Sequence, residues 1–101
     1  MKNVNYRDLV NDRLEEMTPD QRVEYDAAYE RAGLALRLAE LFYEARAAAG
    51  LTQTELARRM GTTQPTIARI EGGGRMPTLD MLERLAIAVG QRLDISLGPA
   101  A

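Results

Sequence analysis

Amide, hydroxyl and guanidinium side chains are concentrated between residues 52 and 75. Gln64, Thr66 and Arg69 lie close together there, among apolar positions that a helix would bury. A glutamine can form two hydrogen bonds with adenine, an arginine can do the same with guanine, and a threonine can contact a base or the thymine methyl group. Gln53 opens an earlier segment, where the N-terminus of a helix suits a phosphate. These residue types together indicate recognition of double-stranded DNA.

Two short capped helices joined by a tight turn are predicted to carry these side chains. Thr52 and Glu55 form a capping box at the start of a helix over residues 52–60, and Gly61 supplies the left-handed conformation of the turn. A second helix over residues 63–71 stops at a run of three glycines. This layout is that of a helix-turn-helix, whose second helix enters the major groove. The residues expected to face inward are Leu56, Ala57, Met60, Ile67 and Ile70.

The N-terminal half is also predicted to be helical. A short amphipathic helix is expected over about residues 5–16, and Thr18 and Gln21 form a capping box that starts a new helix reaching residue 49. Gly33 is its weak point, costing about 1 kcal/mol relative to alanine. One long helix or two abutting helices both fit, and a break or bend near Gly33 is favoured. The inward stripe of its second half is expected to comprise Leu34, Leu38, Leu41, Phe42 and Ala45.

The C-terminal part is predicted to add one helix and one strand. The helix covers residues 79–89 and ends at Gly90. Apolar and polar residues then alternate over residues 91–98, which is the period of a β-strand. Because a lone strand leaves its edges unpaired, a symmetric partner or another protein would have to pair with it. The buried face expected on the helix is Leu79, Leu82, Leu85, Ala86 and Val89.

Composition excludes several classes of protein. The 101 residues include no cysteine and no histidine, which removes the disulfides, the thiolate ligands and the commonest general base. We therefore expect no enzyme activity, no catalytic residues, no metal and no cofactor. The N-terminus lacks the apolar core of a signal peptide and no segment resembles a membrane span, so a cytoplasmic protein is expected.

Charge is divided unevenly along the chain. The formal net charge is −2, yet residues 1–44 hold ten acidic and six basic side chains. Residues 46–75 hold five arginines against two glutamates. An acidic N-terminal part and a basic central part therefore suit different partners.

The segment GLTQTELARRMGTTQPTIARIEGG closely resembles the helix-turn-helix of phage repressors and Cro proteins, the XRE family. The resemblance implies an all-α, lambda-repressor-like bundle with an N-terminal helical arm, residues 1–33, and a DNA-binding domain, residues 34–101, that ends in a short β-strand. In that family the first-helix glutamine contacts a phosphate, and the start of the second helix reads bases. Pro65 replaces a polar reading residue of several phage repressors, so one base contact is absent. The DNA-binding residues expected here are Gln53, Thr63, Gln64, Thr66, Arg69 and Arg75.

The acidic arm and the terminal strand extend the resemblance to HigA-type antitoxins of toxin–antitoxin operons. That resemblance implies a homodimer that binds an inverted-repeat operator and also neutralises a small basic RNase toxin. The arm is where the toxin would bind, with Tyr25 and Tyr29 as the candidate contacts. The arm could equally be a solvated helix that lengthens the core or supports the dimer.

Two further functions compete with the antitoxin. The chain could be a stand-alone repressor without a toxin, or an interaction module that no longer binds DNA. An adjacent gene for a small basic protein would favour the antitoxin, and binding to the gene's own upstream DNA would exclude the interaction module.

Overall fold

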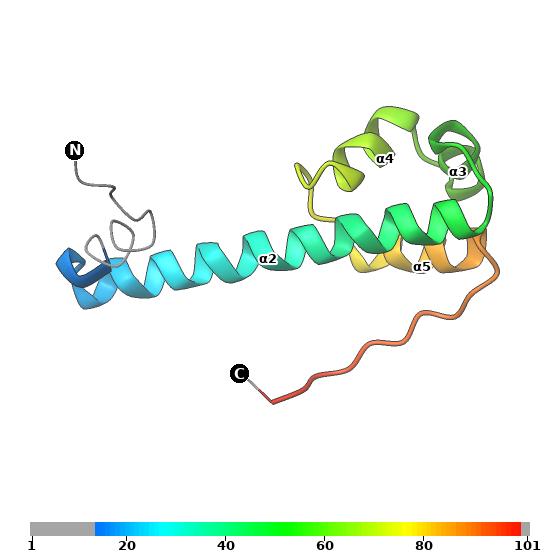
Figure 1. Cartoon of the computed structure of the whole chain (residues 1–101). Coiled ribbons are helices and arrows are strands. Elements are labelled where there is room, and N and C mark those ends of the chain that lie inside the picture. Colours follow the sequence, from blue (N-terminus) through cyan, green and yellow to red (C-terminus); the bar gives the residue numbers. More distant parts are fainter. Residues whose placement is uncertain (1–13, 100–101) are drawn as a thin grey trace, which may run out of the picture. The chain divides into compact units, whose positions relative to one another are not determined.

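The computed structural model describes residues 14–99, and this part of the chain is all-α. Its helices are α2 (Pro19–Ala48), α3 (Gln53–Met60), α4 (Gln64–Glu71) and α5 (Leu79–Ala88). Figure 1 shows α3, α4 and α5 gathered around the C-terminal part of α2. The predicted helix-turn-helix bundle is therefore confirmed, and its two central helices are α3 and α4.

The chain divides into two compact units between Gly33 and Leu34, and each is described by itself. The helix α2 is assigned without interruption across this position, so the break expected near Gly33 is wrong. One glycine costs only about 1 kcal/mol in a helix, which the other 29 residues of α2 outweigh. Among residues 14–99, no helix is both long and apolar enough to cross a membrane. Residues 14–16 are helical, and the rest of the helix expected over about 5–16 lies outside the described residues.

The N-terminal unit contains the predicted capping box. The Thr18 hydroxyl accepts a hydrogen bond from the Gln21 amide at 3.2 Å, and the Gln21 side chain accepts one from the Thr18 amide at 3.0 Å. Two of the amide groups that a helix start leaves unpaired are thus satisfied. An exposed ion pair between Arg22 and Asp26, 3.3 Å apart, lies one turn further along α2.

Hydroxyl caps and one left-handed glycine shape the helix-turn-helix. Thr52 caps α3 by accepting from the Glu55 amide at 3.1 Å, and Thr63 caps α4 by accepting from the Thr66 amide at 3.4 Å. Between the two helices, Gly61 has a φ of +69°, and the next amide, that of Thr62, donates to the Ala57 carbonyl at 2.9 Å. Because the left-handed Gly61 closes α3 at once, α4 can start at Gln64, three residues later, and pack back on α3.

The core of the C-terminal unit draws on all four helices. The side chains of Phe42, Leu56 and Ile67 are completely buried, one each on α2, α3 and α4. Most inward positions expected from the sequence are buried or half-buried. Leu34, Leu41 and Leu79 are instead 42%, 43% and 66% exposed, because helical spacing defines a face but not how far along that face a neighbour reaches. Buried positions that were not expected are Ala39, Leu51, Pro77 and Met81.

Two arginine side chains form hydrogen bonds between α3 and α5. Arg59 of α3 donates to the Ala88 carbonyl at 3.2 Å, and Arg84 of α5 donates to the Met60 carbonyl at 3.4 Å. Each guanidinium thus pairs with a backbone carbonyl that the C-terminal end of the other helix leaves without a hydrogen bond. Its positive charge also opposes the partial negative charge of that helix end. Arg59, which counted toward the basic balance of residues 46–75, serves the packing of these helices.

The predicted C-terminal strand is not observed. Residues 91–99 have no helix or strand assignment, and the part of the chain that the structure describes offers no second strand to pair with them. Leu93 packs against the core, whereas Ile95 is 64% exposed and Leu97 is 100% exposed. The alternation of residues 91–98 therefore places one side chain on the core without forming a strand.

Gly61→Ala is expected to lower the free energy of unfolding by about 1 kcal/mol, because an L-residue is strained in the left-handed region. A Cβ built at Gly61 meets no atom within 4 Å, so the loss would report backbone strain alone. Urea denaturation followed by circular dichroism measures it. Gly98→Ala is the control, since its added Cβ also meets nothing and its φ is not left-handed. Equal effects of the two substitutions would contradict this role of Gly61.

Candidate nucleic-acid interface

Helix α4 buries one face and leaves the other exposed. Ile67 and Ile70 are 0% and 1% exposed and hold the helix on the core. Pro65 and Arg69 are exposed and, at 3.6 residues per turn, lie on the side of α4 away from the two isoleucines. Gln64 is exposed at the first residue of the helix, at the edge of that side, since it precedes Ile67 by three residues. The exposed part of α4 therefore carries an amide at its start and a guanidinium five residues later.

Two of the predicted DNA-binding residues are tied to each other at the start of α4. The hydroxyl oxygens of Thr63 and Thr66 lie 2.9 Å apart and share a hydrogen bond. Thr63 is also the cap of α4, so its hydroxyl already serves the local structure. Thr66 is half-buried beside it. Both contribute to holding the first turn of α4 in place, which is the turn that carries Gln64.

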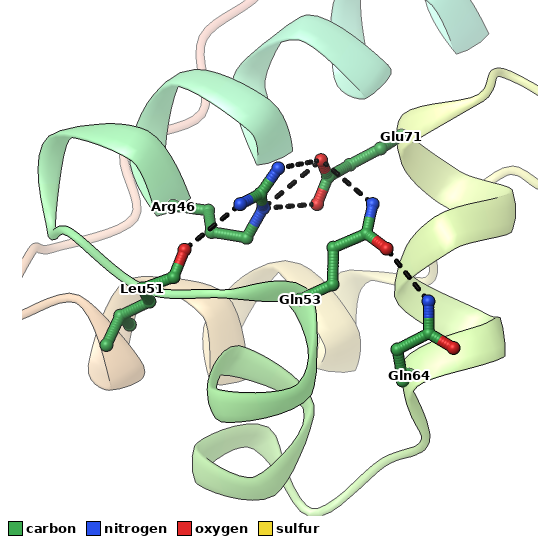
Figure 2. A network of polar contacts seen from close by, with 5 residues as sticks. All are labelled: Arg46, Leu51, Gln53, Gln64 and Glu71. Carbon is green, nitrogen blue, oxygen red and sulfur yellow. Dashed lines mark hydrogen bonds and ion pairs between the residues drawn. The ribbon is translucent and has the colours of Figure 1, made fainter.

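The structure brings Gln53 and Gln64 into direct contact. The Gln64 Nε2 atom donates to Gln53 Oε1 at 2.9 Å, joining the first residues of α3 and α4 (Figure 2). Gln53 is half-buried and Gln64 is exposed. A side chain expected at a phosphate and one expected at a base therefore form a single polar group.

Arg46 and Glu71 form an ion pair beneath this group. Arg46 Nε lies 2.9 Å from Glu71 Oε2, and Arg46 Nη2 lies 2.9 Å from Glu71 Oε1. The third nitrogen, Nη1, donates to the Leu51 carbonyl at 3.0 Å, and the guanidinium lies 5.3 Å from the centre of the Tyr43 ring. The two side chains are only 17% and 6% exposed. This two-pronged pair joins the last turn of α2 to the last residue of α4.

The ion pair also means that Arg46 is not one of the exposed arginines of residues 46–75. The hydrogen bond to Glu71 is the main cause that raises the pKa of Arg46 above its ordinary value, and partial burial opposes it. Arg46 thus remains a cation whose charge is matched by Glu71. The arginines left exposed in the helix-turn-helix region are Arg58, Arg69 and Arg75, together with Arg59, whose guanidinium caps α5.

The remaining predicted residues are not part of the Gln53–Gln64 group. Arg75 is exposed and follows α4 by four residues. Tyr25 and Tyr29 belong to the N-terminal unit, where their rings stack with centres 6.4 Å apart. Tyr29 is 69% exposed and Tyr25 is half-buried.

Glu71 and Arg46 are the residues whose importance the sequence did not reveal. Both were counted in the charge balance of residues 46–75, Arg46 among its five arginines and Glu71 as one of its two glutamates. They are 25 residues apart, so no local periodicity connects them. One feature of the sequence could have pointed to the pair. Glu71 follows directly after Ile70 on a helix with a buried apolar face, and a carboxylate in such a place needs a partner of opposite charge.

Two short helices in a tight turn, with an exposed polar face on the second, define a helix-turn-helix DNA-binding domain. A family model described as helix-turn-helix matches residues 42–95. The chain therefore belongs to the helix-turn-helix family, of the XRE type found in phage repressors. This is a family of DNA-binding regulators rather than enzymes.

Three known proteins illustrate the range of relatives. An uncharacterised HTH-type transcriptional regulator of Methanothermobacter thermautotrophicus is 45% identical over 51 residues, which are 50% of this chain and 74% of the regulator. Antitoxin HigA1 of Mycobacterium tuberculosis is 36% identical over 73 residues, 72% of this chain, and the match spans about half (49%) of HigA1. A solved structure, a toxin–antitoxin module from Streptococcus pneumoniae, contains a chain that matches with a TM-score of 0.50 and 26% identity, over 95% of this chain and 94% of that one.

Glu71→Ala is expected to lower the free energy of unfolding by about 3 kcal/mol, because it leaves the Arg46 charge without its partner in a mostly buried place. Thermal and urea denaturation measure the loss. Glu83→Ala removes an exposed carboxylate of α5 and is the matched control, expected to change stability by less than about 0.5 kcal/mol. A Glu71 variant as stable as the Glu83 variant would show that the ion pair does not hold α2 and α4 together.

Proposed function

We propose that this protein is the antitoxin of a toxin–antitoxin pair that represses its own operon by sequence-specific DNA binding. The observation that carries the DNA-binding half is the pairing of Gln53 and Gln64 on the exposed side of α3 and α4. The toxin-binding half rests on the similarity to HigA1 and to the Streptococcus module, together with the acidic N-terminal unit.

The DNA-binding half assigns a role to each predicted residue. Gln64 and Arg69, on the exposed part of α4, read bases in the major groove. Gln53, at the start of α3, contacts a phosphate and also accepts the hydrogen bond from Gln64 that orients the Gln64 amide. Thr63 and Thr66 hold the first turn of α4, and Arg75 adds a phosphate contact beyond it.

The DNA-binding part of the proposed function also includes a homodimer bound to an inverted-repeat operator. The C-terminal unit exposes apolar side chains that a second copy of the chain would cover in a symmetric dimer. Two recognition helices in such a dimer lie about 34–36 Å apart, so the half-sites are one helical turn or a multiple apart. Exposed large apolar residues of this unit are Leu34, Leu36, Leu41, Tyr43, Leu79, Ile87, Ile95 and Leu97.

The toxin-binding half is assigned to the N-terminal unit. Residues 14–33 carry six acidic and two basic side chains, and all six carboxylates are exposed. Such a surface attracts a basic protein and aligns it as it approaches. Tyr29, exposed and stacked on Tyr25, supplies a rigid aromatic contact of the kind that dominates binding energy at interfaces.

A stand-alone transcriptional repressor is the second candidate. It is favoured by the 45% identity to an HTH-type transcriptional regulator over 51 residues, half of this chain. The two candidates differ in whether a partner protein exists. Co-expression of the full chain with the product of an adjacent small basic gene, followed by co-purification, separates them: a stable complex supports the antitoxin, and its absence supports the stand-alone repressor.

Gln64→Ala and Arg69→Ala are each expected to weaken binding to the upstream operator about tenfold and to relax base preference, because each removes a pair of hydrogen bonds to a base edge. Binding to unrelated DNA should change little. Fluorescence anisotropy with matched operator and scrambled duplexes at one salt concentration measures both. Gln91→Ala, in the exposed C-terminal segment, is the control. If the double variant kept full operator affinity, α4 would not be the recognition helix.

Tyr25→Ala combined with Tyr29→Ala is expected to abolish rescue of cells that express the adjacent toxin gene, because it removes the stacked aromatic contact. Operator binding by this variant should be unchanged. Gln64→Ala combined with Arg69→Ala is the reciprocal control, which should still rescue growth. If the tyrosine variant rescued growth fully, the toxin-binding role of these tyrosines would be wrong.

A further inference from the structure

A continuous polar chain runs from the ion pair to the surface of α4. Glu71 Oε1 lies 2.9 Å from Arg46 Nη2 and 3.5 Å from Gln53 Nε2, and Gln53 Oε1 lies 2.9 Å from Gln64 Nε2 (Figure 2). The chain crosses from α2 to α4, then to α3, and returns to α4. It starts at an ion pair that is mostly buried and ends at an exposed amide.

We propose that Glu71, held by Arg46, is a positioning residue that sets the base preference of Gln64 through the amide of Gln53. This inference rests on the proposed function, in which Gln64 reads a base. It assigns to Glu71 a role in specificity as well as the role in stability described above.

The direction of each hydrogen bond follows from the chemistry of the groups. Arg46 can only donate, and it keeps Glu71 as a carboxylate, which can only accept. The NH2 group of Gln53 must therefore face Glu71, since the reverse orientation would bring two oxygen atoms together at about the same distance. The contact of 3.5 Å is long, so its main effect is to exclude that reversed orientation.

The orientation of Gln53 then fixes that of Gln64. Because Gln53 turns its oxygen toward Gln64, the NH2 group of Gln64 must face Gln53, as observed at 2.9 Å. Gln64 is left with its oxygen and one N–H for an outside partner. One acceptor beside one donor complements adenine, which presents the N6 amino donor and the N7 acceptor in the major groove.

The reversed chain would have the opposite preference. If residue 71 were a donor, Gln53 would turn its oxygen toward it and its NH2 group toward Gln64. Gln64 would accept that bond with its oxygen and would present two N–H donors outward. Two donors complement guanine, which presents the O6 and N7 acceptors. The polarity of the residue pair 46 and 71 thus selects between two purines at a base that neither residue touches.

The test compares base preference at one position among four full-length proteins: wild type, Gln64→Ala, an apolar pair and a charge-swapped pair. The apolar pair is Arg46→Met with Glu71→Leu, and the charge-swapped pair is Arg46→Glu with Glu71→Arg. Selection from randomised duplexes first identifies the position whose preference depends on Gln64. Affinities for duplexes that differ only by adenine or guanine there are then measured, so that changes in general DNA affinity cancel in the ratio.

The wild type is expected to prefer adenine by about tenfold, the apolar pair to lose most of that preference, and the charge-swapped pair to prefer guanine. If Gln64→Ala left every base preference unchanged, the base-reading role proposed for Gln64 would be wrong, and the positioning role of Glu71 with it. If Gln64→Ala altered the preference while both paired variants kept that of the wild type, the recognition helix would stand and the positioning role of Glu71 would fall.

A measurement on the wild-type protein covers the case in which the paired variants do not fold, which thermal denaturation would reveal. In free protein, NMR should detect a scalar coupling through the hydrogen bond from Gln64 Nε2 to the side-chain carbonyl carbon of Gln53. The reverse coupling, from Gln53 Nε2 to Gln64, or the absence of both, would overturn an amide orientation fixed before DNA binds.

Discussion

The ion pair between Arg46 and Glu71 is the constraint on which the surface proposed to bind DNA depends. It joins the end of α2 to the end of α4, and the same guanidinium holds the Leu51 carbonyl where the chain enters α3. A charge pair this little exposed has to be satisfied on every side, because an unmatched charge there costs several kcal/mol. Its geometry therefore fixes α4 against the core at one end while the Thr63 cap fixes the other.

The same constraint separates the structural arginines from those available to DNA. Arg46 and Arg59 are held by Glu71 and by the end of α5, so fewer guanidinium groups of the helix-turn-helix region are available to DNA than its sequence implies. In the proposed function, base recognition then depends on the few groups at the exposed part of α4. A recognition surface with one amide and one guanidinium depends on their exact orientation, which explains why Gln64 is supported by a second glutamine.

The sequence predicted what local chemistry determines. Threonine caps, the glycine turn and the helical periodicity placed α3, α4 and α5 within one or two residues, since each signal involves neighbours in the chain. Contacts between distant residues could not be predicted in the same way: Arg46 and Glu71 are 25 residues apart, and Gln53 and Gln64 are 11 apart. The helix does not break at Gly33, and residues 91–98 form no strand within the described part of this chain; both expectations came from single-residue or period-two signals, which tertiary context can override.

The structure of the full chain bound to a duplex from its own upstream region is the most direct test of the claim that α4 recognises DNA. We expect α4 to lie in the major groove, with the Gln64 amide about 3 Å from the edge of an adenine and Gln53 between that amide and a phosphate. A complex in which α4 faces away from the duplex, or in which Gln64 contacts no base, would contradict it.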